Sequence, residues 1–231
     1  MNSPVEDEGD VHLRIAELAR ELHNGQGADD RQIASAVVQA AVMDIPGAEH
    51  ASLTVASNRR SIESFASTDP LALLHDQIQS EVLEGPCISA ALHDRIVRID
   101  DLESETRWPA YRARALAETS TRSTLSIQMF TSQGAIGALN LFADKPHAFD
   151  LEAEDIGVVF ATHAALAWNS MRKDQQFHSA LANRDVIGQA KGMLMERFGI
   201  DAIGAFDLMK RLSQDSNTKL VEIARKITTS R

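Results

Sequence analysis

The sequence predicts an α+β fold in which a domain of strands and helices precedes a unit made only of helices. Five short segments between residues 51 and 141 carry the alternating apolar pattern of strands. Helical periodicity flanks and interrupts them, and beyond residue 150 it is the only pattern. The expected parts are a disordered tail over 1–10, an N-terminal helix over 11–28, a mixed domain over 29–170 and an all-α domain over 171–231.

The first segments are expected to be helical or disordered. Residues 1–10 are acidic and hold few apolar side chains, so we expect no fixed structure there. Apolar residues recur at helical spacing over 11–22, and the sequence NGQG then breaks the pattern. Asp29 or Asp30 can cap a second helix, which should end before Pro46.

The strands are expected as two hairpins and one single strand. They cover 51–55, 62–66, 95–99, 125–129 and 136–141. The turn at 132–134 joins the last two, which favours an antiparallel pairing. Between them, Asp69 followed by Pro70 has the form of a helix start for 71–83, and a further helix is expected over 109–117.

The last part of the chain carries three helical patterns. Asp150 can cap a long helix in which only single glycines occur before Phe198, so we expect a continuous or once-broken connection. Asp201 can cap the next helix. Ser216 or Asn217 can cap the last, whose apolar residues at 220, 223, 224 and 227 follow helical spacing.

Charge is distributed unevenly along the 231 residues. The whole chain has 23 Lys and Arg against 33 Asp and Glu, a net charge of −10. From Met171 onward, however, 11 basic residues stand against 7 acidic ones. A basic tail on an acidic body points to a polyanion such as nucleic acid, although ordinary solvated helix faces would give the same balance.

The single cysteine excludes an intrachain disulfide and a zinc site built of cysteines. Cys87 follows Gly85-Pro86 at an expected helix start, where the helix dipole would lower the thiol pKa and raise its reactivity. Redox sensing and simple packing both stay open. No run of 18 apolar residues occurs, and the polar start does not resemble a signal peptide, so a cytoplasmic protein without membrane contact is expected.

Motifs for catalysis or metal binding are not found. The sequence has no P-loop, no GxGxxG and no nucleophile elbow, and its eight histidines show no metal-ligand spacing. His178 lies in a helical stretch, but too little chain follows for a kinase ATP domain. We therefore expect no catalytic residue, no metal site and no cofactor.

Residues 29–168 resemble a GAF domain. The resemblance is carried by EGPC at 84–87, DLESETRWP at 101–109, the segment 123–129 and GAIGALNL at 134–141. It implies a small-molecule sensor with a central antiparallel sheet and helices on its faces. It also implies a ligand pocket between sheet and helices, for an unidentified small molecule, with Cys87, Arg107 and Trp108 at its edge. Packing on the sheet is the alternative for these side chains.

The tail resembles an ANTAR domain, a three-helix RNA-binding module of antitermination regulators. The matching residues are RDVI at 184–187, QAKGMLM at 189–195, Ala205-Phe206, Leu208, Leu212-Ser213, Asn217, Lys219-Leu220 and Ala224. No receiver domain is seen ahead of the tail, so the aspartyl phosphorylation of some relatives has no evident acceptor.

Lys210, Arg211 and Lys219 are expected to cluster near the turn between the last two helices, which also offers Ser213, Gln214 and Asn217 as hydrogen-bonding groups. The candidate RNA-binding residues are Lys191, Lys210, Arg211, Ser213, Asn217, Lys219 and Arg225. Looped RNA exposes phosphates and splayed bases, which cations and amides bind. Asn217 as a plain helix cap and Lys191 as a solvated lysine remain open, and stacking on bases would have to use Phe198 or arginine planes.

Together these features predict a regulator whose sensor domain controls an RNA-binding tail that stabilises RNA hairpins. A homodimer through the connecting helix would couple the two domains. Two alternatives remain: a DNA-binding transcription factor that uses the same three helices, and a protein-interaction or dimerisation module.

Overall fold

A computed structural model describes residues 30–58, 61–131 and 134–229. The expected disordered tail over 1–10 and helix over 11–28 lie outside this part of the chain. Contacts divide the chain into one unit up to Ser170 and a second from Met171.

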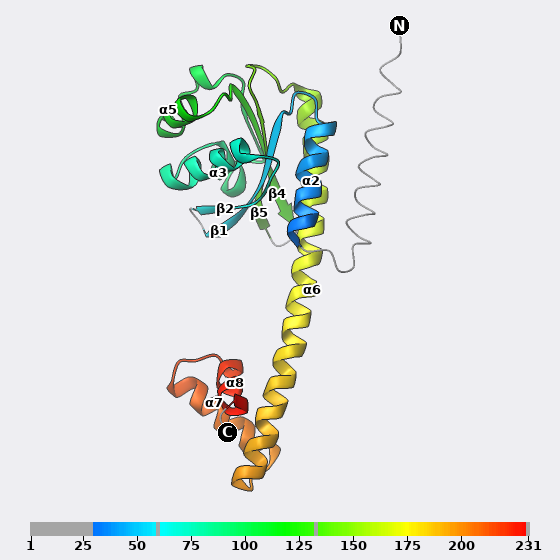
Figure 1. The fold of residues 1–231 in the computed structure, drawn as a ribbon, viewed down its shortest axis with the longest axis vertical. Helices are drawn as coiled ribbons and strands as arrows, with labels where there is room; N and C mark the ends of the chain where they lie inside the picture. The colour runs from blue at the N-terminus through cyan, green and yellow to red at the C-terminus, as the bar shows by residue number, and fades with distance from the viewer. Residues whose placement is uncertain (1–29, 59–60, 132–133, 230–231) are drawn as a thin grey trace. The chain divides into compact units, whose positions relative to one another are not determined.

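The first unit is a five-stranded sheet with helices on both faces (Figure 1). Its elements are α2 (Asp30–Asp44), β1 (His50–Asn58), β2 (Ser61–Ser67), α3 (Pro70–Val82), α4 (Pro86–Leu92), β3 (Ile96–Ile99), the 3-10 turn η1 (Leu102–Ser104), α5 (Pro109–Glu118), β4 (Ser123–Thr131), β5 (Gly134–Ala143) and the first part of α6 (Leu151–Phe198). The strand order is β2-β1-β5-β4-β3 and every pair is antiparallel. The predicted α+β class with an antiparallel sheet is therefore confirmed.

The two faces of the sheet differ in chemistry. On the face toward α2 and α6, residues such as Leu53, Ile127 and Leu139 form the main apolar core with Val38 and Phe160. Figure 1 shows α2 and α6 side by side on this face, with α3 and α5 on the other. The opposite face carries the alternate positions of the same strands, because successive side chains of a strand point to opposite sides.

Three predicted helix caps are confirmed. The carboxylate of Asp69 accepts hydrogen bonds from the backbone N–H of Leu71 and Ala72. Asp150 accepts from the N–H of Ala153 at 2.9 Å, at the start of α6. Asp201 accepts from the N–H of Gly204 at 2.8 Å, at the start of α7. In each case the side chain satisfies a helix N–H that has no partner within the helix.

The second unit is a three-helix domain formed by the end of α6, α7 (Ala202–Asp215) and α8 (Leu220–Thr229). Ala190, Leu194, Ala205, Met209 and Ala224 form its small buried core. The unbroken course of α6 over 48 residues matches the continuous form of the expected connection.

The expected capping of α8 by Ser216 or Asn217 is wrong. Asn217 has a left-handed backbone, with φ at 48°, and α8 begins only at Leu220. The N–H of Ser216 and that of Asn217 bond back to carbonyls of α7, so both residues end α7 instead. Asparagine is well suited to this role because its side chain tolerates the left-handed region.

Candidate functional site

A layer of polar side chains is buried on the α3–α5 face of the sheet. Ser52, Asn140 and Ser126 lie opposite one another on the three neighbouring strands β1, β5 and β4. The Asn140 amide donates to the hydroxyls of Ser52 and Thr54, each at 3.2 Å. All four side chains are buried, although this alternating pattern would normally indicate a solvent-facing surface.

Several atoms of this layer have no hydrogen-bond partner among the described residues. They are Asp76 Oδ2, Asn140 Oδ1, Ser126 Oγ and Thr124 Oγ1. Buried polar atoms in native proteins are almost always paired, with protein or with ordered water. Of these atoms, Asn140 Oδ1 can only accept a hydrogen bond, whereas the two hydroxyls can also donate one.

Asp76 is the one carboxylic acid in this described layer, and it projects from α3. The hydroxyl of Ser52 donates to Asp76 Oδ1 at 2.9 Å. Complete burial raises the pKa of Asp76 to about 7, because the ionised form is poorly solvated there.

A neutral histidine completes the same interior. His75 contacts Thr121 through Nε2 at 2.8 Å and the hydroxyl of Tyr111 through Nδ1 at 3.0 Å. Its ring stacks on Phe142 at 4.4 Å. Burial lowers the pKa of His75 to about 3, so the ring is a neutral bridge between α3, α5 and the sheet.

Cys87 lies in this layer, and its burial favours packing over redox sensing, the two interpretations that the sequence left open. The residue does stand at a helix start, but it is 0% exposed and its Sγ contacts Thr54 Oγ1 at 3.1 Å. Burial raises the pKa of the Cys87 thiol well above its usual range, because the thiolate would be poorly solvated there, and the nearby Asp76 carboxylate adds to this effect. The thiol is thus a packed, uncharged group.

The other two expected pocket residues lie further out. Trp108 is half-buried and packs against the clusters that contain Cys87 and Tyr111. The Arg107 side chain is 50% exposed, pairs with Glu105 at 2.7 Å and covers the Trp108 ring. The structure therefore does not bring Arg107 and Cys87 to one cavity.

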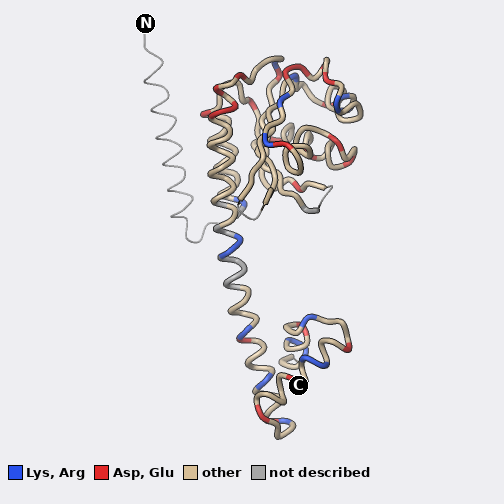
Figure 2. Tube along the Cα trace, turned by 180° about the vertical axis from the view of Figure 1, so that it is seen from behind, with Lys and Arg blue, Asp and Glu red and all other residues tan. Residues whose placement is uncertain are grey.

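In the tail, the predicted RNA-binding cations fall into three places. Lys210, Arg211 and Lys219 are exposed and flank the bend between α7 and α8, where Figure 2 marks the cations. Lys191 lies instead in a separate groove between α6 and α7. Arg225 is exposed and lies on α8, about 7.5 Å along the helix from its start at Leu220, at a rise of ~1.5 Å per residue.

These cations are available to a ligand. Within the described ranges, no ion pair is found for Lys191, Lys210, Arg211, Lys219 or Arg225. One hydrogen-bond donor of the bend is already engaged within the protein, however, because the Ser213 hydroxyl donates to the carbonyl of Thr218 at 2.6 Å. Ser213 is thus a turn-stabilising residue whose oxygen can still accept a hydrogen bond.

The groove that holds Lys191 contains groups the sequence analysis did not assign to a site. It has a volume of about 530 Å³. Its lining residues are Arg184, Asp185, Ile187, Gly188, Gln189, Lys191 and Phe206. Phe206 is 42% exposed. The only sequence signal was that most of these positions belong to the motif shared with ANTAR domains.

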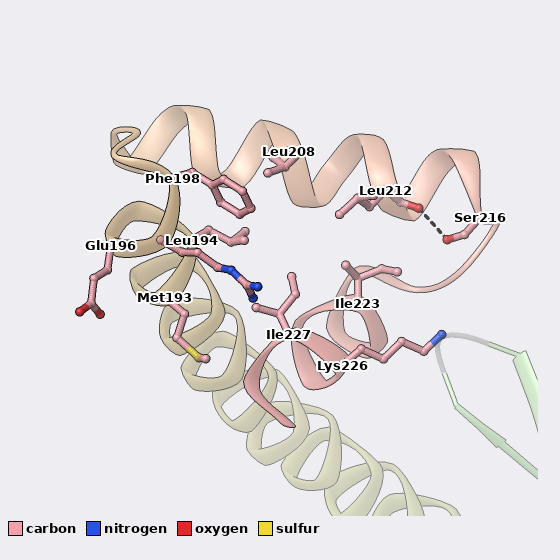
Figure 3. A pocket seen from close by; sticks show the side chains of 11 residues that line it. Met193, Leu194, Glu196, Phe198, Leu208, Leu212, Ser216, Ile223, Lys226 and Ile227 are labelled. Carbon is pink, nitrogen blue, oxygen red and sulfur yellow. Dashed lines mark hydrogen bonds between the residues drawn. The ribbon is translucent and has the colours of Figure 1, made fainter. Parts of the chain in front are cut away.

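A second hollow in the tail is mainly apolar (Figure 3). Its volume is about 870 Å³, and Leu194, Phe198, Leu208, Ile223 and Ile227 are among its lining residues. Phe198, the expected stacking residue, is here a wall of this apolar opening, while Glu196 points away from it.

One group in the first unit has the geometry of metal ligands. Ligand atoms of Glu49, His50 and Asp144 lie within 4.8 Å of one another. His50 pairs with Asp69 at 2.7 Å, and Asp144 accepts a hydrogen bond from Ser120 at 2.8 Å. Both side chains are thus already engaged by the protein.

The fold defines a chain of two parts, an α+β domain followed by a three-helix domain. The sequence profile of the GAF domain matches residues 27–169, and that of the ANTAR domain matches residues 175–227. The chain therefore belongs to the GAF domain family and ends in an ANTAR domain. Both are regulatory domains. A comparison with curated protein sequences gave no match.

Solved structures share the fold of the first unit. The GAF domain of a phosphoenolpyruvate-protein phosphotransferase from Coxiella burnetii has 16% identity and a TM-score of 0.52, covering 75% of this chain and 99% of its own. The GAF domain of a putative sensor histidine kinase from Pseudomonas syringae pv. tomato has 16% identity and a TM-score of 0.51, covering 76% and 96%. A free methionine-R-sulfoxide reductase from Neisseria meningitidis, solved with its substrate, has 13% identity and a TM-score of 0.54, covering 69% and 89%. At these identities the likeness shows the fold alone.

Among the described helices, none combines the length and the apolar character needed to cross a membrane.

Proposed function

We propose that this protein is an RNA-binding antitermination regulator whose tail stabilises structured RNA hairpins under the control of the GAF domain. The observation that carries the proposal is the set of exposed cations at the α7–α8 bend, Lys210, Arg211 and Lys219, which have no acidic partner among the described side chains. Cations of this kind neutralise phosphates. With Lys191, Ser213, Asn217 and Arg225 they form the proposed RNA-binding set.

The protein would act by binding and stabilising an RNA hairpin, and no covalent step is needed. An antiterminator hairpin that is bound by protein is stabilised against the competing terminator, by an amount set by the protein concentration relative to its Kd. This account needs a tail that distinguishes looped RNA from duplex DNA. The bend offers amides and hydroxyls beside its cations, which suits splayed bases more than a regular phosphate backbone.

A homodimer through α6 is part of the proposal. Leu151, Val158 and Leu166 of α6 are exposed large apolar residues. Their spacings of 7 and 8 residues are close to two helical turns, so they share one side of the helix. A second copy packed on this stripe would let a change in the GAF domain alter the arrangement of two tails. Leu166→Glu should then convert a dimer to a monomer in sedimentation velocity, whereas Leu73→Glu, an exposed apolar residue on α3, should not.

The sensory ligand is proposed to bind at the polar layer of the sheet. The unpaired Asn140 Oδ1 would accept a hydrogen bond from the ligand and the protonated Asp76 would donate one, so we expect a small molecule that offers both a donor and an acceptor, bordered by Cys87 and Trp108. Native mass spectrometry of the purified wild-type protein should detect a retained small molecule. The Asn140→Leu variant should lack that mass, and equal retention by both proteins would remove the layer as the site.

The RNA assignment is tested by direct competition. Full-length protein is bound to a fluorescent tandem-hairpin RNA, and unlabelled RNA or duplex DNA of equal length is added at fixed salt. We expect RNA to compete at least tenfold better than DNA. Lys210→Ala, Arg211→Ala and Lys219→Ala should each weaken RNA binding, whereas Lys145→Ala, an exposed lysine of the first unit, should not. Better competition by DNA would favour the transcription-factor alternative, and no binding to either would favour a protein-interaction module.

A further inference from the structure

The groove between α6 and α7 brings together an aromatic ring and charged groups outside the bend already described. Phe206 comes from α7, while Arg184, Gln189 and Lys191 come from α6. Arg184, Gln189 and Phe206 are exposed, and Lys191 is half-buried. A volume of about 530 Å³ is within the range of small-molecule sites, roughly 300–1,000 Å³.

The phenyl ring of Phe206 is one of several exposed apolar side chains of the tail, and it lines the groove beside cations. Phe206 is 42% exposed, while its neighbours Ala205 and Met209 are fully buried in the three-helix core. Its side chain therefore contributes less to the core than theirs. Aromatic rings beside cations are the parts from which sites for single-stranded nucleic acid are built, since any base can stack on the ring while cations hold the phosphates.

We infer that this groove is a nucleobase-binding site, in which one unpaired base of the RNA loop stacks on Phe206 while Arg184 and Lys191 hold its flanking phosphates. The inference rests on the proposed RNA-binding function and extends it to a place that the bend cations do not reach. Gln189 and Asp185 offer an amide and a carboxylate to the edge of the base, where donors and acceptors alternate. A second copy of the chain seated on the same surface is the competing occupant.

Two glycines of α6 allow a matched test of the groove, because each has room for a side chain and only one of them lines the groove. A Cβ added at Gly188 or at Gly192 would meet no atom within 4 Å. Gly188 lines the groove, and Gly192, one helical turn further, is not among its lining residues. Since leucine favours a helix more than glycine does, neither Gly188→Leu nor Gly192→Leu should destabilise the domain. They form a matched pair that differs in whether the groove is blocked.

The experiment measures Kd for a tandem-hairpin RNA by fluorescence anisotropy with full-length protein, together with thermal melting and sedimentation of each variant. Phe206→Ala should weaken binding roughly 5- to 150-fold, the range expected for one stacked base. Phe206→Tyr should bind as the wild type does. Gly188→Leu should weaken binding to the extent that Phe206→Ala does, and Gly192→Leu should leave it unchanged.

RNAs with an abasic residue at each loop position in turn supply the second readout. One abasic position should weaken binding to the wild type and should cause no further loss with Phe206→Ala, because base and ring form one interaction. If the wild type binds RNA and the groove variants bind equally well, the groove inference is overturned while the proposed function stands. If the wild type binds no RNA, both fall. Loss of binding in both glycine variants together with loss of a dimer would assign the surface to a second copy instead.

Discussion

The buried Asp76 should make the stability of the GAF domain depend on pH in a direction opposite to that of most carboxylates. Its pKa is raised from the model-peptide value of 3.8 to about 7 in the fold. Between these values the folded state holds a proton that the unfolded state releases. The contribution of this carboxyl group to the free energy of unfolding is therefore fully present below pH 4 and is lost as the pH rises through 7. Three pKa units correspond to about 4 kcal/mol.

His75 produces the opposite slope in an overlapping range. Burial lowers its pKa from 6.5 to about 3, so its contribution is present above pH 6.5 and is lost as the pH falls. The wild-type curve between pH 4 and 6.5 is thus a sum of two opposing effects. The difference between wild type and Asp76→Asn isolates the carboxylic acid, because Asp76 is not among the groups that shift His75.

Urea unfolding from pH 4.5 to 8.5, followed by tryptophan fluorescence, measures this difference. Both tryptophans of the chain, Trp108 and Trp168, lie in the first unit, so the signal reports that unit. Asp76→Asn should gain stability over the wild type as the pH rises, by up to about 4 kcal/mol, and the gain should level off above pH 8. The exposed Asp94→Asn serves as the surface control. A stability difference that does not change with pH would refute the assignment of a buried, protonated Asp76.

Three further substitutions test the fold. Gly137→Ala should destabilise the sheet by about 1–3 kcal/mol or more, because the new Cβ would overlap the carbonyl oxygen of Thr54. Urea unfolding measures the loss, and unchanged stability would contradict the close approach of β1 and β5. Tyr111→Phe should cost about 1–3 kcal/mol, because it removes the partner of the buried His75 Nδ1, and a neutral effect would mean that this bond is not formed. Asn217 has a left-handed backbone, so Asn217→Val should lower the stability of the tail by about 1–2 kcal/mol, while Asn217→Gly should not. Thermal circular dichroism measures both variants, and equal melting temperatures would argue against the left-handed backbone.

Most of the fold follows from local patterns in the sequence. Asp69, Asp150 and Asp201 cap helices as their positions predict, and the alternating segments form strands in the expected order. These features depend on neighbouring residues alone, which a sequence shows directly.

The polar layer could not be found in this way. Ser52, Thr54, Ser126 and Asn140 alternate with apolar residues, and the same pattern describes a sheet with one face in water. Only the packing of α3, α4 and α5 over this face makes the layer an interior. For the same reason, the sequence left redox sensing and packing of Cys87 both open, and only the burial of the thiol, which raises its pKa, favours packing.

The tail illustrates a similar limit. Spacing predicted the core residues Leu220, Ile223 and Ala224, but the last helix starts later than its capping signals indicated. Lys191 was a candidate RNA-binding residue because of the motif around it, and the sequence did not say which groups would lie beside it. The fold places it in the groove with Phe206, a relation between two helices that residue spacing on either one does not express.

The salt dependence of RNA binding tests the central claim most directly. Kd for tandem-hairpin RNA is measured from about 50 to 300 mM salt with the wild type and with the triple variant Lys210→Ala, Arg211→Ala, Lys219→Ala. Each phosphate contact to a single strand contributes about −0.7 to the slope of log binding constant against log salt, so the triple variant should be less steep by about 2. Equal slopes for the two proteins would mean that these cations do not contact the RNA.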